Sequence, residues 1–343
     1  MKETDADSIR EIAYAFQASR ILLTAYELGV FSAIDNRQKS SQDVATALGS
    51  DWRATDRLMN ALVAMRLLVK ERSTFRNSPS ALRFLVPSSP DYMSGLMHTI
   101  HLWDTWSTLT KAVKLGFPPR ERRKEDPTAW TEAFIAAMNY RARKQAPVVA
   151  AQMNLREGMR ILDVGGGSGA FAAAFVRTAR GVTATVFDLP DVLPLTERYI
   201  SAEGLLDRID FVAGDYTTDE LPRGYDLVFL SAIIHSNSSD QNRTLLQKCA
   251  RALNPNGNLV VQDFVMDENR TDPPGGAFFA LNMLVGTAAG DTYTESEIRH
   301  WMKEAGLSDI TRCEIPFGSA QIWGRKPDSA FTANGPTSRP LRR

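Results

Sequence analysis

Four glycines within five positions follow a short apolar segment near the middle of the chain. Residues 160–164 are apolar enough for a buried strand, residues 165–169 read Gly-Gly-Gly-Ser-Gly, and residues 170–179 have a helical pattern. Glycine allows a sharp backbone turn and the close approach of a ligand to the backbone. A plain strand-to-helix turn needs fewer glycines than this. We therefore predict a nucleoside-like ligand at the carboxyl end of this strand.

The C-terminal half of the chain alternates between strand and helix patterns. Further apolar strands are predicted at residues 183–190, 209–216, 225–235 and 258–266, with helical segments between them. Strands that alternate with helices form βαβ units, in which helices cover a parallel sheet on both faces. We therefore expect an α/β domain with a doubly wound, Rossmann-like sheet.

The first 90 residues have a different pattern. Helix is predicted over residues 9–34, with Gly29 as a C-cap before the short apolar segment VFSAI. A second, short helix is framed by a cap at Ser40 and a terminating glycine at Gly49, and a third helix starts near Asp51. A strand, a turn and another strand follow, which completes a winged-helix arrangement. Residues 91–150 are predicted to be helical.

Composition narrows the class of protein. The 343 residues carry 40 basic and 40 acidic side chains, and this formal net charge of zero gives no general attraction to nucleic acid or to an anionic membrane. The two cysteines, Cys249 and Cys313, match no metal-site spacing and favour a reducing compartment. The polar N-terminus does not resemble a signal peptide, and no apolar stretch is long enough to span a bilayer. We expect a cytoplasmic protein without a bound metal.

Polar residues stand where three of the predicted strands end. Asp188 ends the second strand and is suited to accept hydrogen bonds from ribose hydroxyls; its alternative role is a turn or helix cap. Asp215 and Tyr216 end the third strand. There the carboxylate can accept a bond from an adenine amino group and the ring can lie against the base, although a strand-end aromatic is often only core. His235 follows the fourth strand.

In their order along the chain, these motifs resemble the caffeate/hydroxyindole-type O-methyltransferase family and its bacterial polyketide- and pigment-tailoring relatives. The resemblance covers residues 9–326. It rests on LGVF (28–31), LDVGGGSG (162–169), FDLPDV (187–192), GDY (214–216), His235, RALNPNGNLVVQD (251–263), ALNMLV (280–285) and TYTESEIRHWMKEAG (292–306). It implies an S-adenosylmethionine-dependent methyltransferase that forms a homodimer.

The resemblance also implies how the chain is divided. A winged-helix dimerisation domain is expected at residues 1–90, a helical linker and substrate-pocket region at 91–150, and an S-adenosylmethionine-binding catalytic domain at 151–326. The polar residues 327–343 are expected to form a disordered tail. Cofactor binding is assigned to Gly165, Gly167, Asp188, Asp215 and Tyr216. Many relatives carry a cofactor-contacting lysine where this chain has Ser231, which leaves at most a hydroxyl or backbone contact.

His235 is the predicted general base. A methyl group on a sulfonium is already activated, so the remaining work is to place an oxygen nucleophile in line with it and remove the oxygen's proton. A histidine near neutral pKa suits proton removal from a phenol or enol; the alternative is a loop histidine that only holds its turn. The family usually reads His-Asp-Trp where this chain has His-Ser-Asn. The glutamate that orients the base in plant relatives matches Thr292, with Asp291 as the candidate substitute.

The acceptor pocket is expected between the two domains, where ligand sites are common. The expected acceptor is a small aromatic or polyketide-like molecule with a hydroxyl group. A stripe of Met and aromatic residues is also ordinary core, so each wall residue has that alternative. The candidate wall residues are Met97, His101, Trp106, Phe134, Met138, Asn282 and Met283.

Three other functions match part of the pattern. Gly165-x-Gly167-x-x-Ala170 also satisfies the dinucleotide fingerprint of NAD-dependent oxidoreductases. The winged helix would suit a transcription regulator, although the helix from Asp51 carries Arg53 and Arg57 and then turns apolar. The departures around His235 would suit an S-adenosylmethionine-binding homologue without methyl transfer, or with C- or N-methylation activity.

Overall fold

The computed structural model describes residues 5–119 and 127–328. Contacts divide the chain into two compact units, Met1–Asp104 and Thr105–Arg343. The sequence suggested a first boundary at residue 90, and the helix α7 (Leu96–Trp106) runs across the observed one. The predicted disordered tail lies outside the described residues, apart from 327 and 328. None of the helices in the described ranges is both long and apolar enough to cross a bilayer.

The first unit has the predicted winged-helix arrangement. Its short sheet has the strand order β1-β3-β2, and its later elements are β1 (Lys39–Ser40), α4 (Ser41–Leu48), α5 (Trp52–Ala64), β2 (Leu68–Glu71), β3 (Thr74–Asn77) and α6 (Pro79–Phe84). Ser40 and Asp43 form a capping box at the start of α4, and Asp51 accepts the backbone N–H of Ala54 at the start of α5. These caps satisfy backbone donors that have no partner inside the helix.

The helical prediction over residues 9–34 is confirmed, and Gly29 is the C-cap that the sequence indicates, but the segment is not one continuous helix. The structure has α1 (Ala6–Tyr14), α2 (Phe16–Leu28) and α3 (Val30–Ile34) instead. Gly29 separates the last two, since its φ of 80° is left-handed and ends α2. Only α2 and α3 contribute buried side chains; α1 has none.

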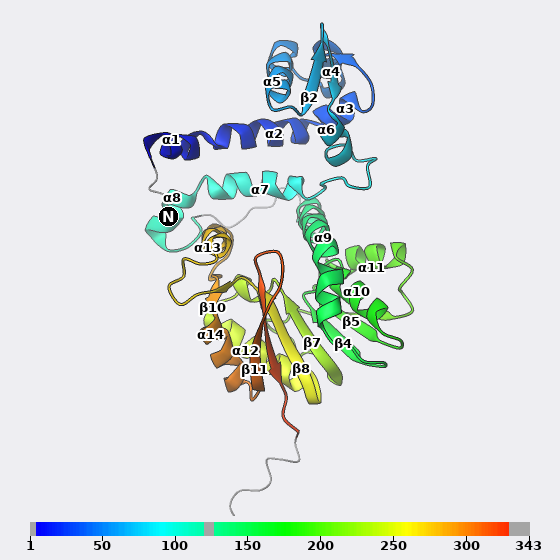
Figure 1. Ribbon diagram of the computed structural model, residues 1–343, viewed down its shortest axis with the longest axis vertical. Coiled ribbons are helices and arrows are strands. Elements are labelled where there is room, and N and C mark those ends of the chain that lie inside the picture. Colours follow the sequence, from blue (N-terminus) through cyan, green and yellow to red (C-terminus); the bar gives the residue numbers. More distant parts are fainter. Residues whose placement is uncertain (1–4, 120–126, 329–343) are drawn as a thin grey trace, which may run out of the picture. The chain divides into compact units, whose positions relative to one another are not determined.

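The second unit is built around a seven-stranded sheet (Figure 1). Its strand order is β11-β12-β8-β7-β4-β5-β6. The strands are β4 (Arg160–Val164), β5 (Thr183–Asp188), β6 (Ile209–Ala213), β7 (Tyr225–Ser231), β8 (Leu253–Asp263), β11 (Ser308–Glu314) and β12 (Ala320–Arg325). β4 to β8 are parallel, as predicted. The antiparallel hairpin of β11 and β12 was not predicted, and it makes the sheet mixed.

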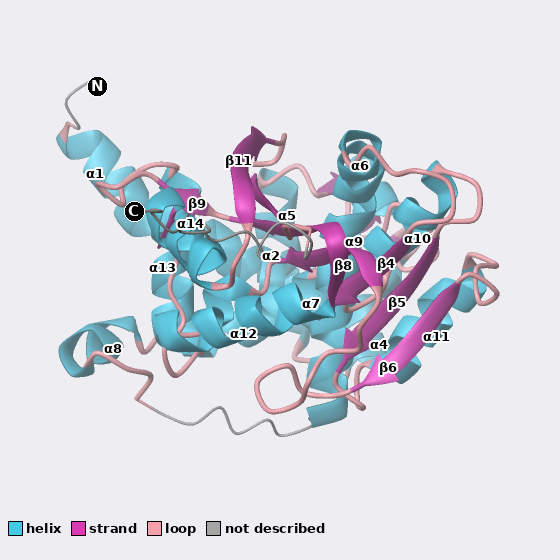
Figure 2. Ribbon diagram, turned by 90° about the horizontal axis from the view of Figure 1, so that it is seen from below, coloured by secondary structure: helices cyan, strands magenta, loops and turns pink. Residues whose placement is uncertain are grey.

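Helices cover both faces of this sheet (Figure 2). One face packs against α9 (Pro127–Gln152), α10 (Ala170–Thr178) and α11 (Leu193–Ala202). The other packs against α12 (Ser239–Ala252) and α14 (Glu295–Glu304). The remaining elements of the unit are α8 (Leu109–Leu115), the 3-10 turn η1 (Ile234–Ser236), β9 (Val265–Met266), α13 (Pro274–Gly286) and β10 (Tyr293–Thr294).

The order of the strands along the chain predicts the edge of this sheet at which a ligand would bind. β4, β5 and β6 succeed one another outward in one direction, and the chain then crosses back to add β7 and β8 on the other side of β4. In open α/β sheets, ligands bind outside the carboxyl ends of the strands at such a reversal. The glycine turn follows β4 at this point.

The packing of the sheet against α10 generates a stability prediction. The ring of Phe229 on β7 is fully buried, with its centroid 5.1 Å from those of Phe171 and Phe175 on α10. We expect Phe229→Ala to lower the free energy of unfolding of this unit by about 4 kcal/mol, because it removes apolar contacts and leaves a cavity. Urea denaturation followed by circular dichroism measures this change.

The matched control is Phe278→Ala, because the Phe278 side chain is 70% exposed. It should change the unfolding free energy by less than about 0.5 kcal/mol. Equal losses in the two variants would contradict the packing described for Phe229.

Candidate active site

The glycine turn after β4 is tightly packed. Gly165, Gly167 and Gly169 have φ values of 67°, 58° and 74°, in a left-handed region that residues with a side chain rarely adopt. A Cβ on Gly165 would lie 2.3 Å from Cδ1 of Ile233, and one on Gly166 would lie 2.9 Å from the carboxyl group of Asp163. The turn therefore cannot take larger side chains without movement of its neighbours.

Asp188, at the end of β5, points at this turn. Its Oδ2 accepts the backbone N–H of Gly167 at 2.8 Å, and its Oδ1 accepts that of Leu189 at 2.8 Å. Burial raises the pKa of the Asp188 carboxyl above its usual value. The structure thus brings together the predicted Gly167 and Asp188, on adjacent strands β4 and β5.

Asp163, the last residue but one of β4, is a second carboxyl group beneath the turn. It is 1% exposed, and its Oδ2 has no hydrogen-bond partner within the described part of the chain. Burial first, and the nearby Asp188 second, raise the pKa of Asp163 to about 7. A buried carboxyl with an unpartnered oxygen costs stability, which is typical of a position kept for a ligand.

Asp215 and Tyr216 lie in the loop after β6, next to the end of β5. The backbone N–H of Gly214 donates to the carbonyl of Asp188 at 3.0 Å, so the two strand ends are joined. Oδ1 of Asp215 accepts bonds from the N–H and the hydroxyl of Thr217. Lys248 of α12 donates to three carbonyls of this loop, those of Tyr216, Thr217 and Asp219. The buried ammonium group of Lys248 therefore holds this loop in place.

His235 lies in η1, just beyond β7, and contacts a carboxylate. Its Nδ1 is 2.9 Å from Oδ1 and 3.0 Å from Oδ2 of Asp263, the last residue of β8. A carboxylate only accepts hydrogen bonds, so the proton of a neutral His235 lies on Nδ1 and Nε2 is left as an acceptor. The ring of Phe279 on α13 meets the imidazole edge to face at 4.7 Å. His235 is thereby held in one tautomer and one orientation.

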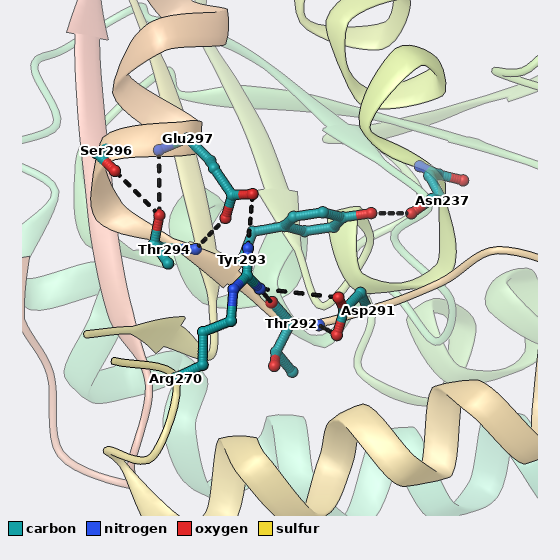
Figure 3. A network of polar contacts seen from close by, with 8 residues as sticks. All are labelled: Asn237, Arg270, Asp291, Thr292, Tyr293, Thr294, Ser296 and Glu297. Carbon is teal, nitrogen blue, oxygen red and sulfur yellow. Dashed lines mark hydrogen bonds and ion pairs between the residues drawn. The ribbon is translucent and has the colours of Figure 1, made fainter. Parts of the chain in front are cut away.

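Asp291, the candidate substitute for the orienting glutamate, has other partners (Figure 3). Its carboxylate lies 3.7 Å from the guanidinium of Arg270 and accepts the backbone N–H of Thr292 at 2.8 Å. The carboxylate against His235 is Asp263 instead. The sequence interpretation of Asp291 is corrected accordingly.

The loop after His235 is held by asparagine where an aromatic residue was expected. Tyr293 donates its hydroxyl to the carbonyl of Asn237 (Figure 3). Tyr216 donates its hydroxyl to Oδ1 of Asn237 at 3.3 Å. Nδ2 of Asn237 donates to Asn242, whose own amide donates to the carbonyl of Ile234. The His-Ser-Asn segment is therefore fixed by buried hydrogen bonds rather than by an aromatic side chain.

The predicted acceptor residues of the second unit fall on separate elements. Asn282 and Met283 lie on α13 with Phe279, and Oδ1 of Asn282 accepts the indole N–H of Trp106 at 2.9 Å. Phe134 on α9 stacks on Trp130 and joins a cluster with residues of α11. Met138 is half-buried one turn further along α9. Ile135, between them, is 3.7 Å from a Cβ built on Gly167, so α9 passes over the glycine turn.

Sequence reasoning missed Asp263, Phe279 and Lys248. Asp263 had a usable signal, because it ends a parallel strand as Asp188 does, and strand ends meet at one edge of the sheet. The predicted strand ran on to residue 266 and so hid this end. Phe279 and Lys248 lie on helices whose sequences carry no comparable signal.

Comparisons with known proteins agree with this architecture. The chain matches the family pattern of an O-methyltransferase dimerisation domain at residues 10–87 and that of an O-methyltransferase domain at residues 110–308. A 3-hydroxy-5-methyl-1-naphthoate 3-O-methyltransferase from Streptomyces sahachiroi is 32% identical over 313 residues, which cover 88% of this chain and 89% of that protein. The N,N-dimethyltransferase OxyT from Streptomyces rimosus is 28% identical, with 88% of this chain and 90% of OxyT covered.

A solved structure has the same fold. The human N-acetylserotonin methyltransferase, crystallised with S-adenosylmethionine, superimposes with a TM-score of 0.82 at 24% identity over 95% of this chain and 99% of that chain. These findings favour an O-methyltransferase over the NAD-dependent oxidoreductase and the transcription regulator, which also matched part of the sequence pattern. The chain therefore belongs to the S-adenosylmethionine-dependent O-methyltransferase family, with a dimerisation domain ahead of the methyltransferase domain.

Proposed function

We propose that this enzyme methylates a hydroxyl group of a small aromatic or polyketide-like acceptor, with His235 as general base and Asp263 as its positioning residue. The observation that carries the proposal is the contact of His235 Nδ1 with both oxygens of the Asp263 carboxylate. When bound, S-adenosylmethionine supplies a methyl group already activated on a sulfonium. The chain's own residues then have to bind the acceptor, orient its hydroxyl and take up its proton.

The residues at the glycine turn suit the cofactor. The turn has no room for a Cβ at Gly165 or Gly166, and Asp188 ends the neighbouring strand with its carboxylate at the turn. We assign ribose binding to Asp188 and contact with the adenine to Asp215 and Tyr216. The unpartnered Oδ2 of Asp163 suits a cationic group of the ligand, because a positive charge would favour the ionised carboxyl.

The His235 and Asp263 pair suits proton removal from a phenol. With its proton on Nδ1, the imidazole offers Nε2 to the acceptor hydroxyl, and the Asp263 carboxylate stabilises the positive charge that His235 gains. Asp263 is itself fixed, because its Oδ1 accepts the backbone N–H of Phe264 at 2.8 Å. A base held in this way loses little entropy when the acceptor arrives.

The surroundings of His235 favour an aromatic acceptor. Phe279 lies against the imidazole and Phe264 lies 4.9 Å from Phe279, so the base stands beside apolar rings. The Streptomyces sahachiroi relative acts on a hydroxynaphthoate by name. On the same helix, the amide of Asn282 is turned by Trp106, whose indole donates to its oxygen. We assign acceptor binding to Phe134, Met138, Asn282 and Met283.

N-methylation is the second candidate, favoured by the similarity to OxyT, which is named as an N,N-dimethyltransferase. An amine acceptor would also need to lose a proton, so His235 serves either reaction. The two differ in the product. Mass spectrometry and NMR of the product formed from an aminophenol acceptor would show whether oxygen or nitrogen carries the new methyl group.

We also propose that the enzyme works as a cytoplasmic homodimer. Ile12 and Tyr14 of α1 are exposed in the single chain, with Ile12 at 73%, and they lie inside the part that matches the dimerisation domain. Apolar side chains concentrated on one exposed helix mark an interaction site. Both cysteines are free thiols, which agrees with a reducing compartment.

The base assignment predicts different effects for two carboxylates. His235→Ala should lower kcat by about 10³-fold and Asp263→Asn by about 10²-fold, whereas Asp291→Asn, whose carboxylate pairs with Arg270, should lower it less than about threefold. The KM for S-adenosylmethionine should stay unchanged.

Steady-state kinetics with a panel of hydroxynaphthoates and hydroxyquinones measure these effects. Asp263→Glu keeps the charge and should recover part of the rate. Equal losses in Asp263→Asn and Asp291→Asn would contradict the proposed role of Asp263. A wild-type enzyme that binds S-adenosylhomocysteine but methylates nothing would favour the homologue without methyl transfer.

Asp163 predicts a pH-dependent stability. Its folded pKa of about 7 lies above the ordinary aspartate value of 3.8, so between these values the folded protein holds a proton that the unfolded chain releases. Stability is therefore fully present below the lower value and is lost as the pH rises through the higher one. Asp163→Asn removes this loss. We expect the variant's gain in unfolding free energy over wild type to be about 2 kcal/mol larger near pH 8 than near pH 5.5.

Urea denaturation of the ligand-free proteins at several pH values provides the measurement. Asp207→Asn, at an ordinary surface position, serves as the control and should keep the pH dependence of the wild type. Parallel curves for Asp163→Asn and wild type would show that Asp163 is already ionised in the folded protein.

The proposed dimer predicts that a charged residue on α1 disrupts dimerisation. Ile12→Asp should shift the protein from dimer to monomer in multi-angle light scattering at micromolar concentration, because it buries a carboxylate in an apolar interface. Leu206→Asp, an exposed apolar position of the methyltransferase domain, should leave the mass unchanged. A wild-type protein that elutes as a monomer would contradict the homodimer.

A further inference from the structure

A row of polar side chains crosses three strands at the ligand edge of the sheet. In the strand register Ser231 of β7 pairs with Gln262 of β8, and Gln262 pairs with Gln321 of β12. They point to the face covered by α9 and α10, because side chains alternate along a strand and their second neighbours Phe229, Val260 and Trp323 pack in that core. Gln262 is 3% and Gln321 is 0% exposed. Burying two amides is costly unless their hydrogen bonds are made.

The hydrogen bonds of this row form one chain, which we call the amide relay (Ser231, Gln262, Gln321 and Trp323). The indole N–H of Trp323 donates to Oε1 of Gln321 at 3.0 Å. Nε2 of Gln321 donates to Oε1 of Gln262 at 2.9 Å. Nε2 of Gln262 donates to the hydroxyl oxygen of Ser231 at 3.1 Å. The relay thus links a partly buried tryptophan to the end of β7.

The tryptophan fixes the direction of the relay. The orientation of a glutamine amide is set by its partners, since its oxygen only accepts and its nitrogen only donates. An indole nitrogen is a donor only, so it must face the oxygen of Gln321, and the nitrogen of Gln321 must then face the oxygen of Gln262. The last amide in turn faces Ser231 with its nitrogen. Ser231 therefore accepts within the relay, and its own hydrogen is left to be donated elsewhere.

Ser231 stands beside the glycine turn. The register pairs Val164 with Leu230, so the next residues on the two parallel strands are Gly165 and Ser231. Asp188 at the end of β5 and Asp215 in the loop after β6, both assigned to the nucleoside, lie on one side of β4, whereas β7 lies on the other side. The amino-acid end of a ligand that lies across the turn is then left to β4 and β7. That end offers an ammonium, which only donates, and a carboxylate, which only accepts.

We propose that the amide relay holds the Ser231 hydroxyl as a hydrogen-bond donor to the carboxylate of the cofactor's amino-acid end. The inference rests on the proposed cofactor site. A hydroxyl whose hydrogen is free matches the carboxylate, and on the same face of the adjacent strand the unpartnered Oδ2 of Asp163 matches the ammonium. Ser231 contacts the ligand, and Gln262, Gln321 and Trp323 act through it as positioning residues.

Two ligands separate this role from general damage to the site. S-adenosylhomocysteine carries the amino-acid end, and 5′-methylthioadenosine keeps the nucleoside but lacks that end. In isothermal titration calorimetry with the full chain, Ser231→Ala should lower the affinity for S-adenosylhomocysteine on the order of tenfold. This loss is expected for a hydrogen bond to a charged group. Its affinity for 5′-methylthioadenosine should stay within about twofold of the wild type. Ser231→Thr keeps a hydroxyl and should recover most of the lost affinity.

The positioning residues are tested by variants that keep Ser231. Trp323→Phe removes the donor that fixes the relay's direction, so it should lower the affinity for S-adenosylhomocysteine about threefold. Gln262→Leu should lower this affinity by a similar factor. In a Ser231→Ala background neither change should weaken it further, because the relay acts only through that hydroxyl. Trp52→Phe, which removes an indole hydrogen bond to Ser41 in the first unit, is the matched control and should leave both affinities unchanged.

Each outcome bears on one claim. Equal weakening of both ligands by Ser231→Ala would overturn the carboxylate contact. Unchanged binding in Trp323→Phe, or additive losses in the double variants, would overturn the relay. Thermal unfolding of every variant identifies a loss that comes from misfolding, and Trp323→Phe keeps the test valid if Gln262→Leu does not fold. A wild-type protein that binds neither ligand would instead contradict the proposed cofactor site.

Discussion

The parallel pairing of β4 with β7 is the constraint on which the site depends. It places the two strands on either side of the point where chain order reverses, so the glycine turn and the end of β7 open at the same edge. Backbone hydrogen bonds fix this register, and a slip by one residue would turn Asp163 and Ser231 to the opposite face. The assignments to the cofactor site assume this alignment, and both strands are largely buried.

Buried polar groups mark where this unit departs from an ordinary core. Gln262 and Gln321 find partners in each other, in Ser231 and in Trp323, and Asp263 is satisfied by His235 and the backbone of Phe264. Asp163 differs, because one of its oxygens has no partner among the described residues and burial favours its neutral form. A protein without a ligand would gain stability from a smaller or apolar residue here. The retained carboxyl therefore agrees with a cationic ligand group above it.

Much of the fold could be predicted from the sequence, because strand ends and caps have local signals. The five parallel strands, the Ser40 cap and the positions of Asp188 and His235 at strand ends follow from apolar runs and their polar boundaries. The hairpin of β11 and β12 could not be predicted in the same way. β11 is a mostly exposed edge strand with a polar sequence, so it lacks the apolar run that identifies an interior strand. The break in the helix at Gly29 was visible as a cap, but the separation of α1 from α2 at Ala15 was not.

Some residues of the candidate site could likewise be predicted from the local sequence, and others are brought together only by strand pairing. Asp263 lay inside a predicted strand that in fact stops there, so its carboxylate was counted as part of the strand rather than as its end. The amide relay was invisible for a stronger reason. Its members are separated by up to 92 positions, from Ser231 to Trp323, and only the pairing of β7, β8 and β12 aligns them. A polar residue in a strand becomes interpretable only when its cross-strand neighbours are known.

The departures from the family motif near His235 can be understood from this geometry. Asparagine at 237 replaces an aromatic residue, yet four hydrogen bonds that involve Asn237 or Asn242 fix the loop. The aromatic surface beside His235 comes instead from Phe279 on α13, a helix distant in sequence. The loop therefore holds the imidazole through buried polar contacts, whereas the neighbouring ring belongs to a helix outside that loop. Under the proposed function, changes on α13 would alter which acceptor is bound without moving His235.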